Sequence, residues 1–73
     1  MDKKTKELVG LAAAVAGHCQ KCFDYHYNEA GKQGVAKEDI AEAIELAKAV
    51  RQAGVNDMDE FVTRKQGRAA DKE

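Results

Sequence analysis

The chain contains no proline, and its apolar residues recur three and four positions apart along most of its 73 residues. Proline breaks helices, and this spacing places apolar side chains on one helix face. No segment alternates apolar and polar residues in the manner of a half-buried strand. Helix-favouring alanine, glutamate, lysine and leucine dominate the composition. The sequence therefore predicts an all-α fold.

We expect four helices. The first covers about residues 3–16, the second begins near residue 19 and ends between residues 31 and 34, the third covers residues 37–53, and a short fourth lies near residues 57–62. Glycines at positions 17 and 54 end the first and third helices. Asp57 and Glu60 have the spacing of a capping box at the start of the short fourth helix. Residues 1–62 form the predicted helical core domain, followed by a charged, frayed C-terminal tail over residues 63–73.

The first helix is apolar on more than one side. One apolar stripe consists of Leu8, Leu11, Ala12 and Val15. Three further apolar residues widen it, namely Val9, Ala13 and Ala16. Such a helix needs more than one packing partner, and a chain this short buries little surface by itself. We therefore expect a small antiparallel bundle that assembles as a homo-oligomer. The other predicted core residues are Phe23, Ile40, Ala43, Ile44, Ala47, Val50 and Phe61.

Charge and hydropathy exclude two classes of partner. The net charge is −1 with no basic face, which argues against nucleic acid. The longest apolar stretch, residues 8–17, is too short to cross a membrane. We expect a cytoplasmic protein, and in that reducing compartment two cysteines close in sequence indicate catalysis or metal binding more than a structural disulfide.

Cys19 and Cys22 form a Cys-x-x-Cys motif at the predicted start of the second helix. Two intervening residues put both sulfurs on the same side of the first helical turn, close enough for reversible disulfide formation. A helix N-terminus also stabilises a thiolate, and Lys21 adds a positive charge nearby. The alternative is a pair of buried, inert cysteines. The motif favours thiol redox chemistry.

His26 and Glu7 are the other candidate site residues. His26 lies one helical turn after Cys22 on the same face, where an imidazole can take or give the thiol proton. Glu7 shares a face with apolar residues, so its carboxylate is expected to have a specific partner, for which a histidine on the next helix is suitable. The hypothesis is a carboxylate–imidazole–thiol relay. The alternatives are a core histidine bonded to a backbone carbonyl and a solvated first-turn glutamate.

Either cysteine can be the nucleophile. The helix dipole favours Cys19 and proximity to His26 favours Cys22, to which we assign the attack. One alternative function is a zinc site with ligands from Cys19, Cys22, His26 and His18 or Glu7. Cys19, Cys22 and His26 lie on one helix, where three ligands cannot easily surround a zinc ion tetrahedrally. We therefore expect no metal and no other cofactor. A purely structural oligomer with incidental cysteines is a further alternative.

The spacing of these residues resembles the alkylhydroperoxidase D core within the carboxymuconolactone decarboxylase family. The shared pattern is a glutamate, eleven residues, Cys-x-x-Cys, three residues and a histidine, here from Glu7 to His26. Residues 31–43 are similar to the family's turn and following helix, and the likeness runs from about Lys4 to Val50. Lys21 stands where the alkylhydroperoxidase D proteins carry a histidine.

The resemblance implies an all-helical fold that assembles as a trimer, hexamer or similar ring. It implies a thiol-dependent peroxidase that cycles between dithiol and disulfide, with a peroxide or disulfide substrate and an external dithiol reductant. It maps Cys22 to the peroxide-attacking thiol, Cys19 to the resolving thiol, and Glu7 and His26 to the proton relay. A disulfide reductase or electron carrier without peroxidase activity uses the same residues and stays open.

Overall fold

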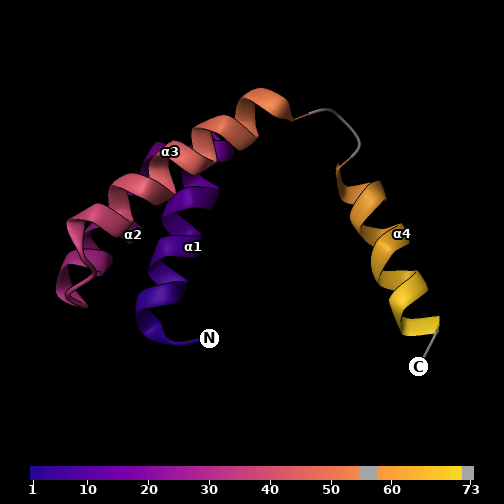
Figure 1. Ribbon diagram of the computed structural model, residues 1–73, viewed down its shortest axis with the longest axis horizontal. Helices are drawn as coiled ribbons and strands as arrows, with labels where there is room; N and C mark the ends of the chain where they lie inside the picture. Colours follow the sequence, from indigo (N-terminus) through magenta and orange to yellow (C-terminus); the bar gives the residue numbers. More distant parts are fainter. Residues whose placement is uncertain (55–57, 72–73) are drawn as a thin grey trace.

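The computed structural model describes residues 1–54 and 58–71, and this part of the chain is helical and contains no strand (Figure 1). The helices are α1 (Lys3–Ala16), α2 (Gln20–Lys32), α3 (Lys37–Ala53) and α4 (Met58–Asp71). The all-α prediction is confirmed, and the first three helices keep their predicted bounds to within one residue. Asp57, the first residue of the predicted capping box, lies outside the described residues.

Helix α1 packs against both α2 and α3 and supplies the centre of a small core. Leu11 and Ala30 are completely buried, and Val35 and Ile40 complete the cluster. Four half-buried side chains pack against it, namely Leu8, Phe23, Ala43 and Ile44. Val50 does not belong to the buried stripe as predicted, because it lies near the end of α3 with 57% of its surface exposed.

The turn between α1 and α2 is a Schellman motif, the hydrogen-bonded helix ending that contains one left-handed residue. The left-handed residue is His18 (φ 59°), and the preceding Gly17 has an ordinary φ of −91°. The backbone N–H of Cys19 donates to Ala14 O at 2.9 Å, and that of His18 donates to Val15 O at 3.4 Å. The end of α1 therefore holds the backbone of Cys19 directly.

A second Schellman motif ends α2, with Gly34 in the left-handed conformation at φ 75°. Val35 N donates to Ala30 O at 3.0 Å, and Gly34 N donates to Gly31 O at 3.1 Å. Both Val35 and Ala30 belong to the core, so the turn that leads into α3 is fixed by packing as well as by hydrogen bonds.

Helix α4 stands apart from α1, α2 and α3, as Figure 1 shows, and among the described residues it packs against none of them. The frayed tail expected from residue 63 is instead helical as far as Asp71, helped by an i,i+4 pair between Arg64 and Glu60 at 3.2 Å. The prediction that Phe61 is a core residue is wrong, because 49% of its surface is exposed. No helix in the described ranges is both long enough and apolar enough to cross a bilayer.

Candidate active site

Cys19 and Cys22 are joined by a disulfide at the first turn of α2. Cys19 is the N-cap residue, with an extended backbone, and its Sγ accepts a hydrogen bond from the Cys22 backbone N–H at 3.2 Å. The two Cα atoms are 5.3 Å apart, within the usual range for protein disulfides. The predicted proximity of the two sulfurs is therefore confirmed. After reduction, the same N–H can stabilise a thiolate on Cys19.

The two cysteines differ in their surroundings. Cys22 is exposed, whereas Cys19 is partly buried. Cys19 lines a hollow of about 450 Å³ that Cys22 does not line. The disulfide therefore has two chemically distinct approaches, one from open solvent and one from the hollow.

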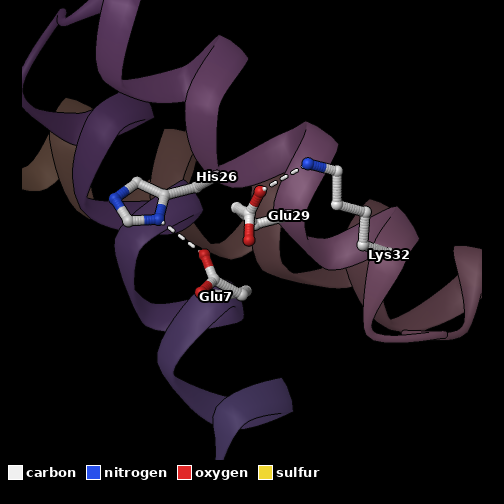
Figure 2. Close-up of polar contacts among 4 residues, drawn as sticks. All are labelled: Glu7, His26, Glu29 and Lys32. Atoms are coloured by element: carbon white, nitrogen blue, oxygen red, sulfur yellow. Dashed lines mark hydrogen bonds and ion pairs between the residues drawn. The ribbon is translucent and has the colours of Figure 1, made fainter.

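Glu7 on α1 and His26 on α2 are brought together by the packing of the two helices (Figure 2). The distance between His26 Nδ1 and Glu7 Oε1 is 2.8 Å, and the exposed fractions of the two side chains are 29% and 17%. With the Nδ1–H donating to the carboxylate, the ring is oriented and its other nitrogen, Nε2, faces away from Glu7 and can act as a base.

Gly10 explains how the imidazole fits between the helices. A Cβ placed on Gly10 would lie 2.5 Å from Cε1 of His26 and 2.6 Å from both ring nitrogens. The ring therefore rests directly on the backbone of α1. Sequence reasoning did not identify Gly10, although a glycine inside a helix costs about 1 kcal/mol relative to alanine and so requires a reason.

Tyr25 and Glu29 are neighbours of His26 along α2. The ring of Tyr25 meets the imidazole edge-on, with centroids 5.0 Å apart. Glu29, one turn further along α2, is ion-paired with Lys32 at 3.1 Å (Figure 2). Glu7 is the carboxylate that bonds to the imidazole, at 2.8 Å.

The hollow lies where the C-terminal ends of α1 and α3 meet the start of α2. Arg51 reaches across it from α3, and its Nη1 donates to Val15 O at 3.1 Å. His18 and Asp24 also line it. Among the described residues, no three histidine, cysteine, aspartate or glutamate side chains gather closely enough to hold a metal ion.

The described residues thus form a helical fold with a Cys-x-x-Cys disulfide at the start of α2, one helical turn before a histidine that is bonded to Glu7. The sequence pattern of the carboxymuconolactone decarboxylase family matches residues 1–58. The chain belongs to that family, which confirms the resemblance seen in the sequence.

A curated relative is similar to most of this chain. It is "Uncharacterized protein 4 in cox locus" from Paracoccus denitrificans, 37% identical over 51 residues, which are 70% of this chain and 46% of the relative. The match thus spans about half the length of that relative. No solved structure matches the chain.

Proposed function

We propose that this protein is a thiol-dependent peroxidase of the alkylhydroperoxidase D type, which cycles between the Cys19–Cys22 disulfide and its dithiol. The observation that carries the proposal is the 2.8 Å bond between Glu7 and His26, because it supplies an oriented base one helical turn from Cys22. A disulfide with only a structural role needs no such base. Membership in the carboxymuconolactone decarboxylase family supports the same chemistry.

Cys22 is the thiol that we assign to attack on the peroxide. It is the more exposed cysteine, and His26 follows it four residues later on α2. Cys19 is the resolving thiol, because its partly buried position next to Cys22 suits condensation within the protein better than capture of a free oxidant.

The cycle balances as a two-electron oxidation of the dithiol. His26 takes the Cys22 proton, and the thiolate attacks one peroxide oxygen, so that an S–O bond forms and the O–O bond breaks. The departing alkoxide takes the proton from His26 and leaves as an alcohol. Cys19 then displaces water from the sulfenic acid to form the disulfide. An external dithiol reduces the disulfide by two exchange steps and is itself oxidised.

The test is peroxide consumption with dithiothreitol as reductant. We expect Cys22→Ser to abolish turnover. Cys19→Ser should leave a sulfenic acid on Cys22 that a dimedone label and peptide mapping detect. His26→Gln should lower the rate by about 10²-fold or more, as loss of a general acid–base does. Lys48→Gln, an exposed change on α3, is the matched control. Stronger dimedone labelling of Cys19 in Cys22→Ser than of Cys22 in Cys19→Ser would contradict the assignment of the attacking thiol.

A disulfide reductase is the second candidate, and the hollow beside Cys19 is the observation that favours it. Its volume suits an organic molecule, whereas a small peroxide needs no such space. Wild-type protein that exchanges with disulfides but consumes no peroxide would identify this function in place of the first.

We also propose that the chain works as a homo-oligomer such as a trimer or hexamer. Large apolar side chains are exposed on several helices, among them Val9, Leu46, Val50, Met58 and Phe61. Exposed apolar surface of this kind is typical of interfaces between proteins. Sedimentation equilibrium tests the proposal, and a monomer at all concentrations would contradict it.

A further inference from the structure

The hollow beside Cys19 combines reactive, charged and apolar groups. Its volume of about 450 Å³ falls in the range of small-molecule sites. Val15 and Phe23 supply apolar surface, and Cys19 supplies a sulfur. A molecule seated in the hollow therefore meets Cys19, whereas one arriving from solvent meets the exposed Cys22.

Two residues of opposite charge line the hollow, Arg51 and Asp24. Within the described ranges, neither forms an ion pair with another side chain. The Nη1 of Arg51 donates to Val15 O at 3.1 Å, which anchors the guanidinium. The other N–H groups of a guanidinium can still bind an anion.

This pair of charges selects the ligand. Both residues are exposed and solvated in the free protein. A ligand with a carboxylate alone can pair with Arg51 but not with Asp24, and one with an amine alone can pair with Asp24 but not with Arg51. A molecule with both groups satisfies both side chains. We propose that the hollow binds an amino-acid thiol or its disulfide, with the carboxylate on Arg51, the ammonium group on Asp24 and the sulfur at Cys19. This inference rests on the dithiol–disulfide cycle proposed above and names its small-molecule substrate class.

The exchange balances in both directions. With reduced protein, the Cys19 thiolate attacks one sulfur of the bound disulfide, and the first ligand thiol leaves with a proton. Cys22 then attacks Cys19 Sγ, which forms the protein disulfide and releases the second ligand thiol. In reverse, two ligand thiols reduce the protein and leave as one disulfide. The N–H bond to Cys19 Sγ favours the thiolate that the first step requires.

The experiment compares three disulfides that differ in charge: cystine with both groups, cystamine with amines only, and the disulfide of mercaptopropionate with carboxylates only. The reduced Cys22→Ser variant traps the adduct on Cys19, and mass spectrometry gives the rate. Each rate is divided by that of free dithiothreitol with the same disulfide, which corrects for intrinsic reactivity. Arg51→Gln and Asp24→Asn are then added to this background. Lys48→Gln and Glu42→Gln are the matched controls, because neither residue lines the hollow.

We expect cystine to react fastest after correction. Arg51→Gln should slow the two carboxylate-bearing disulfides about three- to fivefold more than cystamine, as expected for a partly exposed charge pair. Asp24→Asn should slow the two amine-bearing disulfides more than the third. Arg51→Lys, which keeps the charge, should recover part of the rate, and thermal melts check that each variant is folded.

The same substitutions in a Cys19→Ser background should not alter the ranking of the three disulfides at Cys22, which lies outside the hollow. Equal effects on all three disulfides, or equal effects at Cys22, would overturn the proposed site. Failure of the peroxidase proposal gives a different result, namely wild-type protein that exchanges with disulfides and leaves peroxide untouched.

Discussion

Replacing Gly10 with alanine should separate the stability of this protein from its redox chemistry. The new Cβ would lie 2.5 Å from Cε1 of His26. Carbon atoms in ordinary contact are about 3.5 Å apart, so the ring must retreat by about 1 Å. The bond between His26 and Glu7 is 2.8 Å long, and a retreat of that size takes the two groups out of hydrogen-bonding distance.

Two opposing contributions set the effect of Gly10→Ala on stability. Alanine inside a helix is more favourable than glycine by about 0.8–1.0 kcal/mol. The lost hydrogen bond between half-buried groups costs about 0.5–1.5 kcal/mol. The free energy of unfolding should therefore change by less than about 1 kcal/mol. Catalysis has no such compensation, because His26 loses its orientation, and we expect peroxide turnover to fall about 10²-fold.

Gly31→Ala is the matched control, since a Cβ at Gly31 meets nothing within 4 Å. It should raise the free energy of unfolding in urea by up to about 1 kcal/mol and leave turnover unchanged. In a His26→Ala background, Gly10→Ala should raise the free energy of unfolding by the full amount expected for alanine over glycine in a helix, because the obstructing ring is absent. Nitrogen NMR of His26 supplies a readout that a change in stability alone would not move. Loss of the hydrogen bond to Glu7 should leave the ring proton free to occupy either nitrogen, so that the Nδ1–H tautomer no longer dominates.

A Gly10→Ala variant that turns over peroxide as fast as Gly31→Ala, and that keeps the wild-type His26 tautomer, would contradict this role of Gly10. That result would mean that the imidazole reaches its working position without resting on the backbone of α1.

Glu7→Gln keeps a hydrogen-bond acceptor but removes the charge that stabilises an imidazolium, so kcat/KM for peroxide should fall by about tenfold or more; an unchanged value would exclude the relay. His18→Gly should raise the free energy of unfolding in urea by about 0.5–1 kcal/mol, because glycine adopts φ 59° without strain; a loss of stability would indicate contacts made by the ring. The Thr5 backbone N–H bond holds the pKa of Asp2 below its ordinary 3.8, so the N-cap stabilises the fold above that pH and is lost as the pH falls through the lowered pKa. The melting temperatures of wild type and Asp2→Ala should therefore differ at neutral pH and converge in acid, and a constant difference would contradict this role.

The sequence predicted helix positions and the pairing of site residues better than it predicted how they fit together. Spacing alone placed the first three helices and suggested a partner for Glu7, because one helical period determines which side chains share a face. The role of Gly10 depends on the approach of a second helix, which periodicity along one helix does not contain. Phe61 was misplaced for a similar reason, since apolar character alone does not tell which surface a side chain packs against.

Helix α1 contacts both the imidazole of His26 and the backbone of Cys19. In the N-terminal half of α1, Glu7 and Gly10 contact the imidazole of His26. The last turn of α1 accepts a hydrogen bond from the Cys19 backbone N–H and another from Arg51. At 1.5 Å per residue, Glu7 and Val15 are about 12 Å apart along one rigid helix. A ligand in the hollow therefore does not need the space that His26 occupies. In the proposed cycle, proton transfer at Cys22 and the reaction of a thiol or disulfide at Cys19 therefore use different positions, so that oxidation and reduction of the same pair need not compete for one binding site.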